Sequence, residues 1–267
     1  SVSLAWRISE EPWFKKSDIL SDMKIRAGYG VTGSQASVST YAYLASYNTS
    51  VYPLGTTGKE QSALISSTLS NPNIHWEQVA QANIGLDFSL LNSRVHLSLD
   101  AYIKNTTDML VKASIPITSG FEDTSTTYTN AGKVRNTGLE VTLNTVNLKG
   151  EFGWESSLTY TYNNNKIKDL NSSVPYYINQ INNSYVTMLA VDYPINVFYG
   201  YVTDGIFQNK QEVDQHAIQP GAEPGDIRFK DLNNDGVIND KDRTVIGNPN
   251  PAHLSPLHNT LARQGLQ

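Results

Sequence analysis

The 267-residue chain contains no cysteine, few charged residues and no long hydrophobic run. Without thiols it has no disulfides, no cysteine-ligated zinc or iron–sulfur site and no thiol nucleophile. Asp, Glu, Lys and Arg make up only 17% of the chain, against a usual share of ~25%. Apolar stretches such as residues 188–191 are far shorter than the ~18 residues of a transmembrane helix. The composition therefore argues against a disulfide scaffold, a helical bundle and a helical membrane protein.

Positive charge is also scarce. The net charge is −5, and Lys15-Lys16 is the longest run of lysine or arginine. A protein that binds the phosphate backbone needs clustered cations, so we expect no nucleic-acid partner.

Catalytic motifs are absent from the sequence as well. It has neither G-x-S-x-G nor H-E-x-x-H, and its five histidines have no metal-ligand spacing. Gly28, Gly30 and Gly33 do spell G-x-G-x-x-G, but a dinucleotide site needs that string to open a helix. The residues that follow have no helical period. The sequence therefore predicts no enzyme and no required cofactor.

What the sequence does contain is strict alternation of apolar and polar residues, which predicts β-strands with one apolar face. The clearest runs are residues 80–88 and 95–101, and similar runs begin at Val2, Met23, Leu139 and Trp154. Weaker strands are expected at about 40–47, 108–117, 127–134, 185–191, 197–207 and 225–231. The fold class is therefore all-β and antiparallel, with about ten to twelve strands.

Alternation alone fits a soluble sandwich or a membrane barrel, and the connections favour the barrel. Residues 91–93 and 149–150 are tight turns, whereas 105–136 and 163–183 are long polar loops. Short turns that alternate with long loops are typical of outer-membrane barrels. Strands 80–90 and 94–104 also have the ~9–11 residues that cross a bilayer. Aromatic residues gather near the expected strand ends, as in membrane girdles: Trp13, Trp76, Trp154, Tyr160 and Tyr162.

In a barrel the apolar rows contact membrane lipid and the polar rows face a water-filled lumen. The residues expected to face the lumen are Gln81, Asn83, Asp87, Arg94, His96 and Asp100. The alternative is a secreted, glycan-binding β-sandwich with a structural calcium loop.

The sharpest local motif is the acidic segment 231–242, which matches the twelve-position calcium loop. Gly236 holds the sixth position, where a sharp turn is required. The expected Ca²⁺ ligands are Asp231, Asn233, Asp235, the carbonyl of Val237, Asn239 and Asp242. Asn and Asp can also hold such a turn without a metal. In either case we expect the segment to stiffen a loop.

A series of segments occurs in the order seen in a known family. They are residues 6–12 (WRISEEP), 24–33 (KIRAGYGVTG), 71–77 (NPNIHWE), 83–88 (NIGLDF), 132–140 (GKVRNTGLE), 198–207 (FYGYVTDGIF), 225–231 (GDIRFKD) and 242–251 (DRTVIGNPNP). Together they resemble the C-terminal barrel of SusC/RagA-type TonB-dependent outer-membrane transporters. The resemblance covers residues 1–251.

The resemblance implies that the chain is part of a 22-stranded barrel in the outer membrane of a Gram-negative cell. Such a barrel is plugged by an N-terminal domain, energised through TonB and covered by a SusD-like lipoprotein. It imports oligosaccharides or peptides. Residues 252–267 depart from the family, because they lack clear alternation and a terminal aromatic residue. We expect either a truncated or frame-shifted end or a divergent strand at 257–263.

Overall fold

The computed structural model describes residues 1–15, 17–34, 41, 43–54, 58–114, 117–121, 126–170, 175–181 and 184–263. Strands make up 62% of the structure and helices 6%, which confirms the all-β antiparallel class. The chain divides into two compact units. The first contains Ser1–Asn164, Lys168–Asn171 and Ala252–Gln267; the second contains Asn165–Ile167 and Ser172–Pro251.

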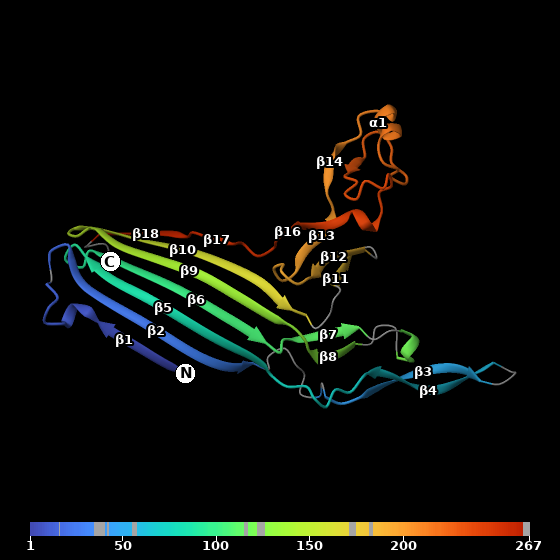
Figure 1. Cartoon of the computed structure of the whole chain (residues 1–267), viewed down its shortest axis with the longest axis horizontal. Helices are drawn as coiled ribbons and strands as arrows, with labels where there is room; N and C mark the ends of the chain where they lie inside the picture. The colour runs from blue at the N-terminus through green and yellow to red at the C-terminus, as the bar shows by residue number, and fades with distance from the viewer. Residues whose placement is uncertain are drawn as a thin grey trace. The chain divides into compact units, whose positions relative to one another are not determined.

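The first unit is built on one long antiparallel sheet of eight strands (Figure 1). Its order is β1 (Val2–Arg7), β2 (Leu20–Ser34), β5 (Glu77–Leu90), β6 (Val95–Thr107), β9 (Lys133–Leu148) and β10 (Phe152–Asp169). The remaining two of the eight strands are β17 (His253–Leu254) and β18 (Leu257–Arg263). Both pair with β10, at successive positions along it. The segment 257–263 therefore forms a strand despite its weak alternation.

The two expected tight turns connect β5 to β6 and β9 to β10. Leu91, Asn92 and Ser93 all have positive φ (50°, 54° and 59°), so the chain reverses within three left-handed residues. Gly150 makes the second turn with a φ of 144°, which a residue with a Cβ rarely adopts. These short turns lie at one end of the sheet, and the long connections start at the other.

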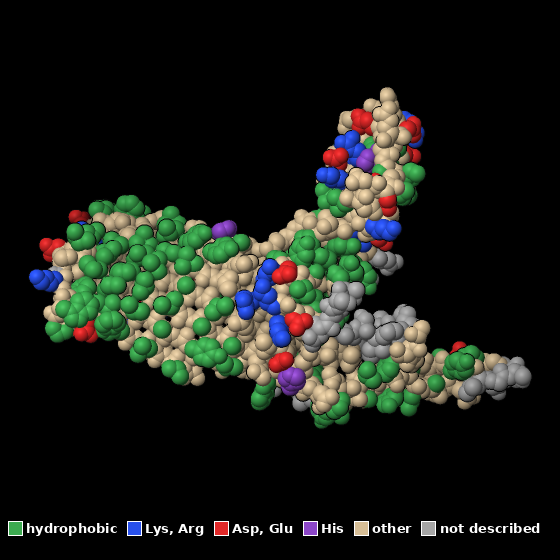
Figure 2. Space-filling model, in the orientation of Figure 1, with side chains coloured by type: hydrophobic (Ala, Val, Ile, Leu, Met, Phe, Trp, Pro, Cys, Tyr) green, Lys and Arg blue, Asp and Glu red, His purple; other side chains and the backbone are tan. Residues whose placement is uncertain are grey.

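The apolar rows of β5 and β6 lie side by side in this one sheet. Leu86 is paired with Leu99 and Phe88 with Leu97. A sandwich would bury these rows against a second sheet, yet Ile84 remains 54% exposed. Figure 2 shows hydrophobic side chains gathered over the long strands on the face in view. The structure therefore agrees with the barrel interpretation and not with the sandwich.

Four shorter sheets occur in the rest of the described chain. The first unit also contains the hairpins β3 (Ser46–Leu54) with β4 (Lys59–Thr68) and β7 (Leu110–Ser114) with β8 (Thr126–Asn130). In the second unit, β11 (Tyr176–Ile181), β12 (Ser184–Leu189), β13 (Val197–Tyr201) and β16 (Arg243–Gly247) form one sheet, and β14 (Thr203–Ile206) pairs with β15 (Ile227–Phe229). The helices are short: η1 (Ile8–Glu10), η2 (Ile117–Ser119), α1 (Lys210–Gln215) and η3 (Asp240–Asp242). No helix in the described part of the chain is long and apolar enough to span a membrane.

The weaker strand predictions were partly wrong. The strand expected at 40–47 begins only at Ser46, where β3 starts; residues 40 and 42 lie outside the described ones, as do 115 and 116 of the strand expected at 108–117. Strands β4, β11 and β16 were not predicted. Each takes its place by pairing with a partner strand rather than from an apolar stripe of its own.

The second unit has a small hydrophobic core. Val197 is completely buried, Met188 and Ala190 are nearly so, and Tyr199 and Val245 pack against them. In the long sheet, the buried apolar side chains among the described residues are Val134 and Ile167. The long sheet is therefore held by strand pairing rather than by a core of its own.

Replacing Gly138 with alanine tests how tightly the polar face is packed. A Cβ at this position would lie 2.5 Å from ring atoms of Tyr102, so that ring must move. We expect Gly138→Ala to lower the stability of the full-length protein by about 1–3 kcal/mol. The matched control is Gly153→Ala in β10, where the new Cβ would lie 3.8 Å from the nearest atoms, those of Ala262. This substitution should lower stability by less than ~0.5 kcal/mol. Equal thermal unfolding of the two variants in detergent would contradict this packing.

Candidate functional site

The polar face of the long sheet carries most of the residues expected to face a lumen. The register pairs Gln81 with Lys104, Asn83 with Tyr102, Gly85 with Asp100, Asp87 with Ser98 and Ser89 with His96. Since paired residues share a face, five of the six predicted residues lie together. The sixth, Arg94, ends the turn before β6, where its N–H bonds to the carbonyl of Leu91.

An ion-pair network that the sequence alone did not reveal lies in the middle of this face. The guanidinium of Arg26 on β2 binds Asp87 at 2.7 Å and Asp100 at 2.9 Å. Ser98 donates to Asp87 at 2.8 Å. Gly85 makes room, because a Cβ there would collide with both Arg26 and Asp100. One cation thus ties three strands together through two carboxylates.

An open polar pocket of about 540 Å³ lies beside this network. It is lined by Gln81, Asn83, Asp100, Tyr102, Lys104 and Glu140. The ring of Tyr102 lies over Gly138, and its hydroxyl donates to Asn163 at 3.2 Å. The pocket combines amides, a phenol and charges of both signs, which can bind a polar molecule.

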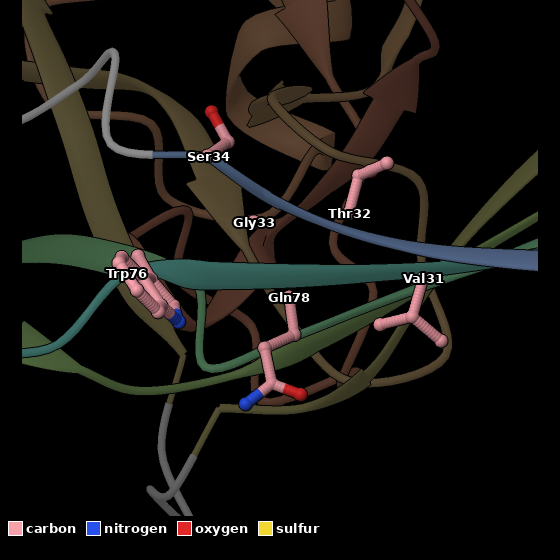
Figure 3. Close-up of a pocket in the computed structure, with 6 residues that line it drawn as sticks. All are labelled: Val31, Thr32, Gly33, Ser34, Trp76 and Gln78. Carbon is pink, nitrogen blue, oxygen red and sulfur yellow. The ribbon is translucent and has the colours of Figure 1, made fainter. Parts of the chain in front are cut away.

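A second pocket, also of about 540 Å³, lies at the end of β2 and β5 from which the long connections start (Figure 3). The indole of Trp76 lies 3.5 Å from the Cβ position of Gly33 and is 61% exposed. Val31 and Gln78 project to one side of the strands, and Thr32 and Ser34 to the other. An exposed indole at a strand end is typical of a membrane–water interface.

Aromatic residues gather at the opposite end of the apolar face as well. Trp6 at the end of β1 contacts Trp13 edge-on, with ring centroids 6.4 Å apart, and donates from Nε1 to Glu11 at 2.8 Å. Trp13 also contacts Phe14, and 63% of Trp13 is exposed. Exposed tryptophans therefore lie at both ends of the long sheet, a distribution typical of membrane girdles.

The acidic segment follows β15 and ends in η3, within the second unit. Its side-chain oxygens accept hydrogen bonds from its own backbone. These bonds run from Gly236 N–H to Asp231 at 2.8 Å, from Asp235 to Asn233 at 2.9 Å, and from Val237 to Asp235 at 3.0 Å. Gly236 turns the chain with a φ of 83°. The segment is therefore a tightly turned loop, as predicted from its spacing.

Asp242 closes this loop from the inside. It is completely buried and accepts hydrogen bonds from the N–H groups of Leu232 and Asn239, each at 2.9 Å. The Asn239 N–H is the largest influence that lowers the pKa of Asp242, and burial opposes it. The carboxylate is therefore charged and held in place at neutral pH.

The calcium prediction finds limited support in this geometry. Among the described residues, no group of three or more His, Cys, Asp or Glu side chains is arranged to hold a metal ion. One buried oxygen does suit a cation: Oδ1 of Asp231 has no hydrogen-bond partner among the described residues, and buried polar atoms normally have one. The ligands would be the six predicted residues. Calcium binding stays a prediction.

Comparison with known proteins gives the family. The family model described as TonB dependent receptor-like, beta-barrel matches residues 1–244. The chain belongs to this family. Members are receptors and transporters rather than enzymes.

Two curated relatives agree with this assignment. The chain is 32% identical to TonB-dependent receptor P26 of Formosa agariphila, over 100% of its own length and 27% of the relative. It is 31% identical to TonB-dependent receptor SusC of Bacteroides thetaiotaomicron, over 93% of its own length and 24% of the relative. This receptor chain therefore spans about a quarter of the curated relatives it matches.

A solved structure shows the same fold. The structure of the RagAB peptide transporter matches with a TM-score of 0.75 at 23% identity, covering 98% of this chain and 27% of that one. The long sheet of the receptor chain is therefore a section of a TonB-dependent receptor barrel.

Removing Arg26 should destabilise the polar face. Arg26→Ala leaves Asp87 and Asp100 side by side without a cation, and we expect the free energy of unfolding to fall by about 2 kcal/mol. Breaking a fully buried ion pair costs ~3–5 kcal/mol, but these groups are partly exposed, so the expected loss of stability is smaller. Arg7→Ala is the control, since Arg7 pairs with Asp22 near the end of the sheet and its side chain is 59% exposed; it should cost under ~1 kcal/mol of stability. The measurement is thermal unfolding of the full-length receptor in detergent. A smaller loss for Arg26→Ala than for Arg7→Ala would be the contrary result.

Calcium binding can be tested by amide hydrogen exchange across residues 231–242 of the full-length receptor. If Ca²⁺ binds, exchange should slow by up to about 100-fold when free Ca²⁺ is 100 times its Kd, relative to a chelator. Asp231→Ala should abolish this protection. Asp214→Asn, an exposed carboxylate on α1, should leave it intact. Identical exchange with Ca²⁺ and chelator would show a loop stabilised by hydrogen bonds alone.

Proposed function

We propose that the chain forms part of the wall of an outer-membrane transporter that imports oligosaccharides or peptides. The import is driven through TonB, and a SusD-like lipoprotein on the cell surface is the partner. The supporting observation is the long sheet, which has one exposed apolar face and one polar face tied by ion pairs. Family membership and the SusC relative agree with this role.

The physical argument rests on the two faces. Ile84 is 54% exposed, Leu4 is 71% exposed and Leu261 is 78% exposed, which is costly in water at roughly 25 cal/mol per Å². Lipid tails remove this cost. On the other face, Arg26 and its two carboxylates need water or polar partners, which a lumen provides. The sheet therefore suits a wall between lipid and an aqueous channel.

Because the chain lacks cysteine, single cysteines report the environment of each face. The experiment uses the full-length receptor in outer-membrane vesicles, with any other cysteine replaced. It compares the labelling rates of two single-cysteine variants at neighbouring positions, Asn83→Cys and Ile84→Cys. We expect a hydrophilic maleimide to label Cys at 83 at least ten times faster than at 84, because lipid shields the second position. Equal labelling would contradict the lipid-facing assignment.

Transport is tested in the source cells. Deletion of the receptor gene, or of its TonB-interacting segment, should abolish growth on the imported oligosaccharide or peptide while growth on glucose stays normal. Wild-type growth of the deletion strain on all such substrates would argue against the import function.

A further inference from the structure

Two charged side chains in the polar pocket have no partner of opposite charge among the residues that the structure describes. Lys104 on β6 and Glu140 on β9 line the pocket described above. Within the part of the chain that the structure describes, neither side chain makes an ion pair or a hydrogen bond. Asp87 and Asp100, by contrast, are both paired with Arg26 on the same face, and the three side chains together leave one negative charge in excess. Electrostatic attraction for a ligand is therefore available at Lys104 and Glu140.

The ring of Tyr102 lies between these two charges. Along β9, Lys104 is paired with Asn136, Tyr102 with Gly138 and Asp100 with Glu140. The ring is pressed flat over Gly138, since its atoms lie 2.5–2.6 Å from the position that a Cβ would take. The order along the wall is therefore a cation, a flat aromatic surface and an anion.

The spacing of the charges sets the length of a ligand. Lys104 is paired with Asn136 on β9, and Glu140 lies four residues further along that strand. At ~3.4 Å per residue the two charged positions are therefore roughly 14 Å apart. An extended peptide spans at most ~3.3–3.6 Å per residue, so three or four residues fit between them. The amides of Gln81 and Asn83 border the same pocket and can bond to peptide groups.

We propose that Lys104, Tyr102 and Glu140, with Gln81 and Asn83, form a binding site for a short zwitterionic peptide. Lys104 binds the C-terminal carboxylate, Glu140 binds the N-terminal ammonium, and one side chain rests on the Tyr102 ring. A neutral oligosaccharide leaves both charges without a partner. The proposal rests on the proposed function, because it requires the polar face to line the channel, and it selects peptides among the substrates considered there.

The test is isothermal titration of the full-length receptor, in complex with its lipoprotein, against tetra-alanine. Unblocked tetra-alanine should bind, and Lys104→Gln or Glu140→Gln should each weaken it by about tenfold or more. N-acetylated tetra-alanine should be insensitive to Glu140→Gln, and the C-terminal amide should be insensitive to Lys104→Gln. The controls are Lys24→Gln on β2 and Glu155→Gln on β10, which alter charges on the polar face outside this pocket and should change affinity less than twofold.

Three results would overturn the proposal. One is equal affinity for blocked and unblocked tetra-alanine; another is binding of maltotetraose that depends on Lys104 or Glu140. The third is a fall in unfolding temperature for both pocket variants with unchanged peptide affinity, which would assign these charges to contacts with another part of the receptor. Each of these results leaves cysteine labelling and gene deletion unaffected, so failure of this site is distinguishable from failure of the proposed function.

Discussion

Unbroken hydrogen bonding between long neighbouring strands is the constraint on which the rest of the structure depends. The register between β5 and β6 runs without interruption from Gln78 and Thr107 to Leu90 and Val95. In lipid, where no water reaches the backbone, such pairing is the only way for strands to satisfy their N–H and C=O groups. Once it is in place, a period of two sends alternate side chains to opposite faces. The division between an apolar and a polar face follows directly, and no separate hydrophobic core is needed.

The hydrogen-bonded register fixes which residues are paired across the polar face, and glycine makes room there for large polar side chains. Opposite Asn83, Asp100 and Tyr102 the paired residues are Gly28, Gly85 and Gly138, and a Cβ at any of the three would collide with the side chain across from it. Large polar side chains can therefore lie flat along the wall instead of projecting from it. Glycine weakens a strand by its own propensity, but the ion pairs and hydrogen bonds that it admits join neighbouring strands and offset part of that loss.

The long strands could be predicted from the sequence because apolar and polar residues alternate along each of them, whichever strand is its neighbour. The turn at 91–93 could be predicted because only three residues separate two such alternating runs. The sequence did not predict the network of Arg26, since its carboxylate partners lie 61 and 74 residues away and depend on a register that no local pattern shows. Strands such as β4 and β16 were missed for the same reason. The acidic loop was recognised because its side chains bond to backbone groups only two to five residues away. Local hydrogen bonds can be inferred from spacing, whereas cross-strand ones cannot.

Charge on the polar face is therefore of two kinds. Arg26, Asp87 and Asp100 have already exchanged water for one another, so a passing solute gains little from them and would have to break existing bonds. Lys104 and Glu140 have made no such exchange with the described residues, and their full electrostatic interaction remains available to a solute that brings the opposite charges at the right spacing. A wall that pairs its central charges with one another, and whose pocket holds Lys104 and Glu140 without an ion-pair partner among the described residues, can stay rigid and still bind. In the proposed site, selectivity arises from the distance between these two charges, which the register of β6 and β9 fixes.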